Sequence, residues 1–511
     1  MVLPGTVLAT VQSGALWGVD ALPVQVEVNT GERGELRFVL VGLPDAAVKE
    51  SMDRVCSALQ NSGFKLPHTR TTINLSPGHL RKEGPLYDLP IAAGLLLASG
   101  QCRGSCDGFL LAGELSLSGK LLPIRGAVAL AIQARRQGLR GVLLPGQSAA
   151  EAGLIGGVPI YAADSLREVV QFLEDNGTLQ PLPLQTFSPA RPESGLDLSD
   201  ICGQERAKRA AEIAVAGGHN LLLVGCPGVG KSMLAKRVAT ILPPPSWEEL
   251  VEIYGIHSAA GLSLDGNWMA GIRPFRSPHH SISRVGLVGG GANPRPGEIS
   301  LAHNGVLFLD ELPEFARGTL ESLRQPLDDG HVVISRSVGK VCFPCAFTLL
   351  AAMNPCPCGY LGSRSHPCRC SRQQICDYRS RVSGPLLDRI DLHIDVPPVP
   401  AALLRSGKRG ETSEQVRRRV EAARLRQGKR LREAKVSCNA RIPEKFFREF
   451  CPLGEAEDQL LRRAMESSAL SARAHGKVLR VARTIADLEG AEAIASPHLV
   501  EALQYRLLDE I

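Results

Sequence analysis

Short apolar runs and helical patterns share the first 175 residues, and together they predict a mixed α/β domain. Five runs that alternate or are continuously apolar predict β-strands. Three longer segments have helical patterns, and Asp45 stands where the first of them needs an N-cap. The expected strands are residues 7–11, 24–28, 37–41, 71–75 and a closing strand at 141–145, and the expected helices are 46–61, 88–99 and 126–137.

The end of the chain has a helical pattern instead. Apolar residues three and four positions apart predict helices at 411–434, 455–466, 474–488 and 496–508. A Pro-, Gly- and Ser-rich stretch without a clear period separates the first domain from the rest and predicts a linker. We therefore expect an α/β protein with an N-terminal domain at 1–175, a linker at 176–198, an α/β core at 199–400 and a helical domain at 401–511.

A phosphate-binding motif organises the middle of the chain. Residues 225–232 fit G-x-x-x-x-G-K-[ST], between an apolar strand at 221–224 and a helix at 233–239. The glycines let successive backbone N–H groups turn around phosphate oxygens at the positive end of a helix. We predict ATP and Mg²⁺ as cofactors, with Lys231 reaching the β- and γ-phosphates and Ser232 ligating Mg²⁺. The predicted nucleotide-binding residues are Gly225, Cys226, Pro227, Gly228, Val229, Gly230, Lys231 and Ser232.

A pair of acids ends a second apolar strand further along. Residues 306–309 are continuously apolar and lead into Asp310 and Glu311. In a parallel sheet such a strand delivers its carboxylates to the edge where the nucleotide binds. We expect Asp310 to hold Mg²⁺ through water and Glu311 to polarise the attacking water as general base. The alternative is an ordinary strand-to-helix cap.

Composition and length narrow the class of protein. The 511 residues allow about three domains, and 44% hydrophobic against 22% charged residues is typical of a globular protein. The longest apolar stretch, 89–99, is too short to cross a bilayer, and residues 1–15 lack the basic region of a secretory signal. Most of the 14 cysteines are scattered singly. We therefore expect a cytoplasmic protein with no membrane partner.

The positive charge is concentrated in one segment. Residues 401–450 contain 15 Lys and Arg against 6 Asp and Glu, so this segment more than accounts for the net charge of +6. A basic face suits nucleic acid or another polyanion. A solvated helix surface explains the same pattern equally well.

A cysteine cluster follows residue 354 and suggests a metal. Four thiolates in two pairs suit a tetrahedral structural Zn²⁺, although C-x-C is tighter than the usual C-x-x-C. Reduced thiols and a disulfide are the alternatives. His279 and His280 are adjacent and would face opposite ways in an extended chain, so we expect hydrogen bonding or a subunit contact from them rather than metal binding. The expected zinc ligands are Cys356, Cys358, Cys368 and Cys370.

Three stretches of the first domain resemble the proteolytic domain of Lon proteases. They are residues 82–85 (KEGP), 112–120 (AGELSLSGK) and 122–126 (LPIRG). The positions that match the catalytic serine and lysine of that family are Leu86 and Val128. Because neither side chain has a proton to share, we expect this fold without its chemistry, in a structural, oligomerising or substrate-handling role.

Longer motifs resemble one family over nearly the whole chain, the ComM/YifB proteins, which are magnesium-chelatase-like AAA+ ATPases. The motifs are residues 273–280 (RPFRSPHH), 289–291 (GGG) and 296–312 (PGEISLAHNGVLFLDEL), with the segments around Asn354 and Arg389. Cys226 stands where proline is usual in this family. We expect little effect from this departure because the position acts through its backbone.

The resemblance implies further catalytic residues and an assembly. Asn354 would be the sensor that orients the lytic water, and Arg389 the arginine finger that acts on the nucleotide of a neighbouring subunit. Arg473 would be the second sensor, brought to the phosphates by a helical lid, with Arg480 as a weaker candidate. A finger of this kind makes sense only in a ring, and we expect a hexamer of the chain with itself.

The resemblance also implies two insertions in the core. One, at 255–291, would interrupt the second core helix and carry a loop toward the pore of the ring. The other is a β-hairpin with strands at 331–336 and 340–343. In helicases of this branch such a hairpin points into the pore, and we expect Arg336 and Lys340 to bind the DNA backbone. A solvated hairpin is the alternative.

The resemblance therefore implies a ring-forming ATPase that moves on branched or single-stranded DNA. It would act as a helicase that promotes branch migration in recombination during natural transformation. One rival is a chelatase-type motor that remodels a protein partner for metal insertion. The other is a Lon-like protease, which Leu86 and Val128 disfavour.

Overall fold

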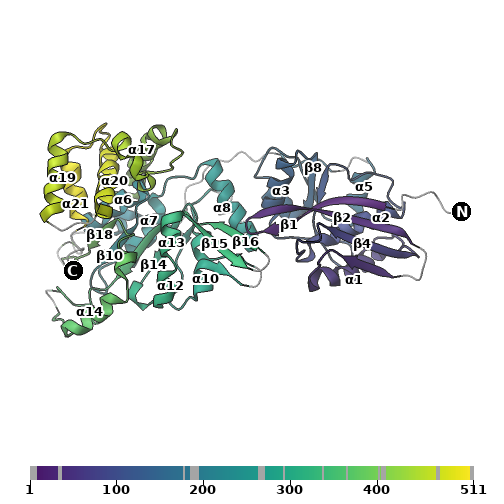
Figure 1. Cartoon of the computed structure of the whole chain (residues 1–511), viewed down its shortest axis with the longest axis horizontal. Helices are drawn as coiled ribbons and strands as arrows, with labels where there is room; N and C mark the ends of the chain where they lie inside the picture. Colours follow the sequence, from purple (N-terminus) through teal and green to yellow (C-terminus); the bar gives the residue numbers. More distant parts are fainter. Residues whose placement is uncertain are drawn as a thin grey trace.

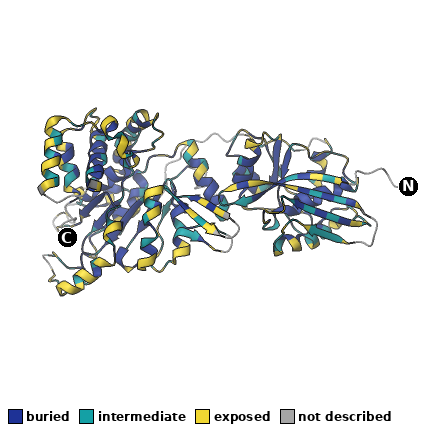
Figure 2. Ribbon diagram, in the orientation of Figure 1, coloured by how far each residue is buried: buried dark blue, intermediate teal, exposed yellow. Residues whose placement is uncertain are grey.

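The structure is a computed structural model of the chain. It describes residues 8–32, 37–175, 179–183, 195–262, 271–291, 294–336, 339–363, 366–400, 403, 410–467 and 472–506. Two α/β bodies lie end to end, with the N-terminal residues in one and the phosphate loop and C-terminal helices in the other (Figure 1). In both, the central strands are largely buried and the surrounding helices expose their outer faces (Figure 2).

The N-terminal body contains a seven-stranded mixed sheet with the strand order β3-β4-β2-β1-β5-β8-β9. Strands β1 and β2 form a long antiparallel hairpin, whereas β5, β8 and β9 are parallel. The elements are β1 (Leu8–Trp17), β2 (Asp20–Glu32), β3 (Phe38–Val41), α1 (Ala46–Asn61), β4 (Arg70–Ser76), α2 (Asp88–Ala98), β5 (Phe109–Leu111), β6 (Glu114–Leu115), β7 (Leu121–Leu122), α3 (Ala127–Arg136), β8 (Gly141–Pro145), α4 (Gly146–Ala152), β9 (Ile160–Ala163) and α5 (Leu166–Leu173).

Local sequence accounts for most of these elements. Asp45 accepts a hydrogen bond from the backbone N–H of Val48 at 2.8 Å, which confirms the predicted N-cap of α1. Helix α2 is buried on nearly every side, as its continuous apolar run requires. The prediction of a closing strand at 141–145 is wrong in one respect: β8 is present, but β9 pairs outside it and forms the edge of the sheet. The four residues of β9 give too short a pattern to be recognised without their partner strand.

The second body contains a five-stranded parallel sheet with the strand order β11-β14-β17-β10-β18. All five strands point the same way, so their carboxyl ends meet at one edge. The elements are α6 (Glu205–Gly217), β10 (Leu221–Val224), α7 (Lys231–Ile241), α8 (Trp247–Ala260), β11 (Phe275–Arg276), α10 (Arg284–Val288), β12 (Gly289–Gly290), β13 (Arg295–Pro296), α11 (Glu298–Leu301), β14 (Val306–Leu309), α12 (Arg317–Glu321), α13 (Arg324–Asp329), β15 (His331–Arg336), β16 (Gly339–Pro344), β17 (Thr348–Met353), α14 (Arg372–Ser380), α15 (Gly384–Leu387) and β18 (Leu392–Asp395).

Helix α8 belongs to both bodies. Its residues Leu250, Ile253 and Tyr254 lie in the hydrophobic core of the N-terminal body. Gly255 contacts Val128 of α3, because a Cβ atom there would lie 4.0 Å from the Val128 side chain. The predicted start of the insertion at 255 is wrong, since α8 continues to Ala260 before the chain leaves the helix. Packing against α3 stabilises the helix beyond Gly255, and residues 263–270 of the insertion lie outside the described residues.

The predicted β-hairpin is confirmed and lies beside the N-terminal body. Strands β15 and β16 pair antiparallel from His331 opposite Pro344 to Arg336 opposite Gly339. The indole N–H of Trp17 donates to the backbone oxygen of Lys340 at 3.3 Å. The hairpin is therefore held by the turn of the β1–β2 hairpin as well as by its own ladder.

The C-terminal helices share one hydrophobic core with α6, α7 and the parallel sheet. The four predicted helices are confirmed with shifted ends, and the fourth ends at Gln504 instead of 508. They are α17 (Ser413–Leu431), α19 (Glu455–Ser467), α20 (Ala472–Glu489) and α21 (Ser496–Gln504), and a short helix that was not predicted, α18 (Phe447–Phe450), lies between the first two.

Helix α17, which lies within the basic segment, uses its arginines inside the chain. The arginines of α17 bond to carboxylates or carbonyls on the same helix and on neighbouring elements, and in this way they join helices to one another. Of the two interpretations that the sequence left open, these contacts favour the structural one. The pairs are Arg417–Glu414, Arg418–Glu414, Arg419–Glu212, Arg419–Glu411, Arg424–Val215, Arg426–Asp487 and Arg430–Asp487.

Candidate functional site

The phosphate loop connects β10 to α7. Gly228 and Gly230 have φ values of 76° and 98°, in the left-handed region that glycine adopts without strain. Helix α7 begins at Lys231, so the backbone N–H groups of its first turn face the loop at the positive end of the helix dipole. This geometry fits the phosphate groups of a nucleotide.

Lys231 is drawn into the loop. Its ammonium donates to the carbonyl oxygens of Gly225 at 2.6 Å and Cys226 at 2.9 Å, and to Oδ1 of Asn354 at 3.1 Å. Burial lowers the pKa of Lys231, and the Asp310 carboxylate opposes this shift. The side chain lies between the loop and the end of β17, as the chemistry of a phosphate-binding lysine requires.

The two expected Mg²⁺ ligands lie in contact. The Ser232 hydroxyl donates to Oδ2 of Asp310 at 2.5 Å, and Oδ1 of Asp310 accepts from the backbone N–H of Glu311 at 2.9 Å. A hydroxyl and a carboxylate at this spacing suit the hard oxygen coordination of Mg²⁺. Glu311 adopts a φ of 53° and its side chain is 59% exposed, so its carboxylate projects from the end of β14 toward solvent.

Sequence reasoning missed two residues beside this site. Gln204 donates to the carbonyl oxygens of Val229 at 3.3 Å and Pro397 at 2.6 Å, and so supports the phosphate loop. His280 Nδ1 lies 3.7 Å from Oε2 of Glu311. The position of Gln204 just before helix α6 could have drawn attention to it, whereas nothing local links His280 to Glu311.

The two adjacent histidines do not face opposite ways as expected. The ring centroids of His279 and His280 are 4.0 Å apart, with an angle of 35° between the ring planes. Nδ1 of His279 lies 2.8 Å from the Ser281 hydroxyl. The chain turns here instead of running extended, which places both rings on one side.

Arg389 lies at the other edge of the sheet. It precedes β18, and β18 pairs with β10 from Leu392 opposite Leu221, so Arg389 is near the start of β10 and the phosphate loop is at its end. Its guanidinium donates to the carbonyl oxygens of Arg324 at 2.9 Å and Pro385 at 2.6 Å, and pairs with Asp328. The four residues of β10, at about 3.3 Å each, separate Arg389 from the phosphate loop of its own chain.

Arg473 lies with Arg389 and not with the phosphate loop. Both line a pocket of about 530 Å³, together with Arg441, Lys477 and Arg480. The expectation that the lid brings Arg473 to the phosphates of its own chain is therefore wrong for this structure. The cause is the packing of α20 against α6 and the loop before β18, which places its first turn at the amino ends of the strands.

The hairpin residues are only partly described. Lys340 is exposed on β16, as a DNA contact requires. The side chain of Arg336 lies outside the described residues. The structure thus leaves Lys340 accessible beside the junction of the two bodies.

The four predicted zinc ligands lie together. Their ligand atoms are all within 4.8 Å of one another, with Sγ–Sγ distances of 3.4 Å (Cys356–Cys358), 3.7 Å (Cys356–Cys368) and 3.6 Å (Cys358–Cys368). Tetrahedral Zn–S bonds of about 2.3 Å give S–S distances of about 3.8 Å. Backbone N–H groups of Tyr360 and Arg369 lower the pKa of Cys358 to about 6, which favours its thiolate. The cluster fits a zinc ion, and its four cysteines are free in this structure, with Sγ atoms too far apart for a disulfide bond.

The cysteine loop is packed against the phosphate loop. A Cβ atom at Gly359 would lie 2.6 Å from the Pro227 side chain, and Gly359 has a φ of 83°. The loop also follows Asn354 directly. A metal in this cluster would therefore fix the surroundings of the phosphate loop and of Asn354.

In the described part of the chain, no helix has the length and hydrophobicity needed to span a membrane.

Comparison with known proteins covers almost the whole chain. Residues 197–404 match the family model described as magnesium chelatase, subunit ChlI; residues 24–148 match subunit ChlI of Mg-chelatase; and residues 410–506 match the magnesium chelatase ChlI C-terminal model. These matches identify an AAA+ module, and the family indicates ATPase activity with ATP and Mg²⁺ as cofactors.

Two relatives are similar over nearly their full lengths, and a third over a short part. The competence protein ComM of Haemophilus influenzae is 47% identical over 511 residues, which covers 98% of each chain. The uncharacterized protein YifB of Salmonella typhimurium is 45% identical over 508 residues, covering 99% of this chain and 98% of that protein. A Lon protease of Salinispora arenicola is 31% identical over 151 residues, only 28% of this chain and 18% of that protein. The chain belongs to the ComM/YifB family of magnesium-chelatase-like AAA+ proteins.

Proposed function

We propose that the chain is a ring-forming, ATP-hydrolysing motor that moves on DNA, and that it promotes branch migration in recombination. The observation that carries the motor is the separation of two half-sites. Phosphate loop, Mg²⁺ ligands and Glu311 lie at one edge of the parallel sheet, and Arg389 with Arg473 lies at the other. A ring in which the second edge of one subunit faces the first edge of the next would complete each site, and we propose a hexamer.

In such a site each residue has a separate task. Backbone N–H groups of the phosphate loop and Lys231 hold the phosphates, and Ser232 and Asp310 hold Mg²⁺. Mg²⁺, when bound, neutralises charge on the phosphate oxygens. Glu311 accepts a proton from the attacking water, and Asn354 orients that water.

The neighbouring subunit supplies positive charge. Arg389 would leave its pair with Asp328 and approach the γ-phosphate, where a guanidinium stabilises the charge that develops during transfer. Arg473, which is exposed at the start of α20, would reach the same phosphates. Both arginines therefore act on the nucleotide of the adjoining subunit.

Two observations support DNA as the substrate. The relative from Haemophilus influenzae is a competence protein, and competence is the capacity to take up DNA. Lys340 is exposed on a hairpin that, in a ring, would face the pore together with Arg336. Binding by these residues would be electrostatic and independent of sequence.

ATP turnover by the purified full chain tests this proposal. We expect single-stranded or branched DNA to raise turnover several-fold, and Lys231→Ala to abolish both the basal and the stimulated rates. Lys340→Ala would reduce the stimulation but leave basal turnover intact, and Lys429→Ala, which alters an exposed lysine of α17, is its matched control. Equal turnover with and without DNA would contradict the DNA part of the proposal.

A chelatase-type motor is the second candidate, favoured by the ChlI family models that match all three parts of the chain. Such a motor would remodel a protein partner during metal insertion. Turnover that ignores DNA but rises with a partner protein would favour this candidate.

We also propose that Cys356, Cys358, Cys368 and Cys370 hold a structural Zn²⁺. The support is the grouping of their sulfur atoms. For the N-terminal body we propose a structural, oligomerising or substrate-handling role, because Leu86 and Val128 are buried aliphatic residues, 5% and 0% exposed.

A further inference from the structure

Donors from the C-terminal helices hold the backbone of the loop that carries Arg389. The ammonium of Lys477, on α20, donates to the carbonyl oxygen of Asp388 and, at 3.2 Å, to that of Ile390. These two carbonyls stand on either side of Arg389. The Lys477 side chain is 11% exposed, and its ammonium lies 3.8 Å from the Asp391 carboxylate. Lys477 is thus a buried cation whose described contacts are concentrated on this one loop.

Two more side chains donate to backbone carbonyls of the same loop. Asn220, just before β10, donates to the carbonyl oxygen of Arg389 at 2.8 Å. Arg506, just after α21, donates to that of Ile390 at 2.8 Å. Consecutive carbonyls at 388, 389 and 390 therefore all accept bonds from side chains, two of which come from the helical domain. Bonds from charged donors in a buried setting are among the stronger ones, so the loop and the helices move together.

A second connection joins α20 to the same loop. The Thr484 hydroxyl lies 2.8 Å from Nε2 of His219, and Nδ1 of His219 lies 3.7 Å from the Asp391 carboxylate. Thr484 also accepts from Asn439 at 3.1 Å. The polar contacts therefore continue from the loop into the centre of the helical domain.

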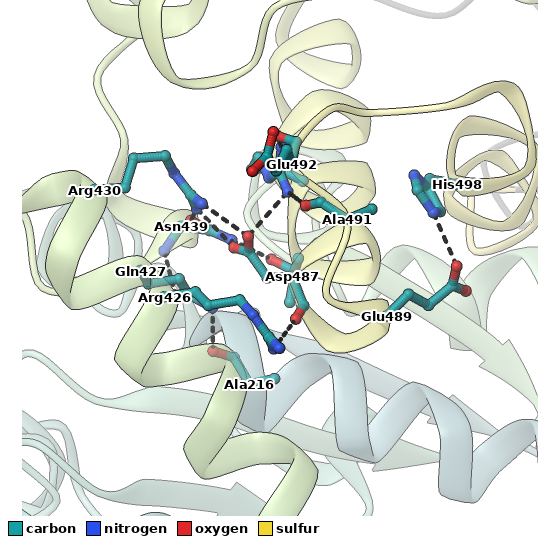
Figure 3. A network of polar contacts seen from close by, with 12 residues as sticks. Ala216, Arg426, Gln427, Arg430, Asn439, Asp487, Glu489, Ala491, Glu492 and His498 are labelled. Carbon is teal, nitrogen blue, oxygen red and sulfur yellow. Dashed lines mark hydrogen bonds and ion pairs between the residues drawn. The ribbon is translucent and has the colours of Figure 1, made fainter.

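Asp487 is the centre of that network (Figure 3). Its buried carboxylate accepts from Arg430 at 2.6 and 2.8 Å and from Asn439 at 2.8 Å, and Arg426 donates to its backbone oxygen at 2.8 Å. Arg426 and Arg430 lie on α17, whereas Asp487 lies on α20. The network thus joins α17 and α20 into one unit.

Helix α17 in turn contacts the helix that follows the phosphate loop. It packs along α7, and the hydroxyl of Ser413 at its start lies 2.6 Å from that of Thr240 on α7. A continuous series of contacts therefore runs from α7, which begins at Lys231, through α17 and α20 to Lys477 and the Arg389 loop. It connects the two edges of the sheet through the helical domain.

We propose that Lys477 is a positioning residue that sets the placement of Arg389, and that it couples the nucleotide site of one subunit to hydrolysis in the next. This inference rests on the proposed function, in which Arg389 acts on the neighbouring subunit. Movement of α17 and α20 relative to the sheet would pull on the two carbonyls that flank Arg389. The arginine would then engage or leave the adjoining site according to the state of its own subunit.

The Lys477→Met variant tests the proposal, because methionine keeps the apolar stem and removes the donors. We expect kcat for ATP hydrolysis to fall about tenfold or more, since the charge-stabilising arginine is misplaced. The Kd of the same subunit for a fluorescent ATP analogue would stay within about twofold, because Lys477 lies at the Arg389 loop, at the opposite edge of the sheet from the phosphate loop. Lys477→Arg, which retains donors, would recover part of the rate. Lys429→Met, at an exposed position on α17, is the matched control and would behave as the parent protein.

Mixed rings separate action on the neighbour from action on the same subunit. In an equal mixture of Lys477→Met and Glu311→Gln chains, about a quarter of the interfaces pair an intact Glu311 with an intact Arg389 loop, and the Glu311→Gln chain still binds the ATP to which its Arg389 loop responds. We expect turnover to recover toward that fraction. No recovery, or a loss of analogue binding by Lys477→Met alone, would show that Lys477 serves its own site and would overturn the proposal, as would an unchanged kcat.

Two companion experiments keep the result interpretable. Mixing Arg389→Ala with Glu311→Gln tests the shared site itself, so failure of that mixture removes the proposed function on which Lys477 depends. Should Lys477→Met lose its thermal transition, Arg506→Met removes a different donor to the same loop. The same lowered kcat and the same recovery in mixed rings are expected from it, and a parental kcat would overturn the proposal.

Discussion

The two bodies of this molecule differ in the kind of residue found at the positions that their resemblances associate with catalysis. In the five-stranded parallel sheet, the polar side chains of Ser232, Asp310 and Asn354 converge at the carboxyl edge, where each is bonded to another residue of the site. In the N-terminal body, Leu86 and Val128, which the resemblance to Lon proteases led us to expect at the positions of a serine and a lysine, are both buried in the hydrophobic core. Both bodies are α/β, so the layered architecture is not what decides activity.

Burial shows how the N-terminal body uses those positions. Val128 is fully buried and faces α8 at Gly255, so this position serves packing between the two bodies. At the other sheet, Glu311 remains 59% exposed and accessible to water. The comparison shows that the α/β architecture can support catalytic residues in one body and packing between bodies in the other. The following predictions test this contrast.

Glu311→Gln should have the largest effect. Because an amide cannot accept the proton of the attacking water, we expect ATP turnover to fall by about 100-fold or more with ATP binding retained. Glu314→Gln, a nearby exposed acid paired with Arg381, is the control and should keep the parental rate. Equal turnover in the Glu311 and Glu314 variants would contradict the role of Glu311 as general base.

The cysteine cluster lies beside the phosphate loop, so its metal content is the next test of how this edge of the parallel sheet is built. Cys368→Ser should lower bound zinc from about one ion per chain to near zero, since three thiolates hold the ion far more weakly than four. Metal content by mass spectrometry and the absorption bands of the cobalt-substituted protein measure this. Cys376→Ser, at an exposed cysteine outside the four, should keep the metal. Retention of zinc by the Cys368 variant would contradict the assignment.

Val128→Lys tests whether this position serves packing between the two bodies. Val128 is fully buried, so Val128→Lys places an unpaired charge between α3 and α8 and should lower the stability of the N-terminal body by about 3 kcal/mol or more. We expect no peptidase activity from the double variant with Leu86→Ser. Leu117→Lys, at a position 57% exposed, should cost less than about 0.5 kcal/mol. Peptide cleavage by the double variant would refute the proposed structural role.

Acid should weaken the same junction through His257 of α8. Burial lowers its pKa to about 4, and its Nε2 lies 3.1 Å from the Leu301 carbonyl oxygen. A histidine with a pKa near 6.5 in the unfolded chain binds a proton there first, so stability falls as the pH drops below about 6.5 and continues to fall until about 4. From pH 7 to pH 5 we expect a loss of about 2 kcal/mol from this residue.

Thermal unfolding at both pH values measures the effect of His257. His257→Gln keeps a donor for Leu301 and does not titrate, so its melting temperature should depend less on pH than that of the parent. An identical pH dependence in both proteins would place the acid sensitivity elsewhere.

Sequence predicted those parts of the structure that depend on neighbouring residues. The strand–loop–helix around Lys231, the N-cap Asp45 and the hairpin of β15 and β16 are encoded locally, and all three are present. The contacts among Lys231, Asp310 and Asn354 followed from one further rule, that parallel strands end at a common edge.

The remaining features depend on contacts between distant segments. Arg473 was expected at the phosphates of its own chain, but packing of α20 places it beside Arg389. The basic residues of α17 could not be distinguished from a nucleic-acid surface until partners such as Glu212 and Asp487 were located. His280 approaches Glu311 only because the chain turns before it.

Helix α8 has a mechanical consequence. It contributes Leu250, Ile253 and Tyr254 to one hydrophobic core, while His257 further along contacts α11 in the other body. Because α8 is a continuous helix packed against both bodies, it would transmit a rotation of one body to the other, which a flexible linker would not. A movement of the ATP-binding body would therefore also move the N-terminal body. A fragment that lacks α8 would expose the apolar surface against which Leu250, Ile253 and Tyr254 pack.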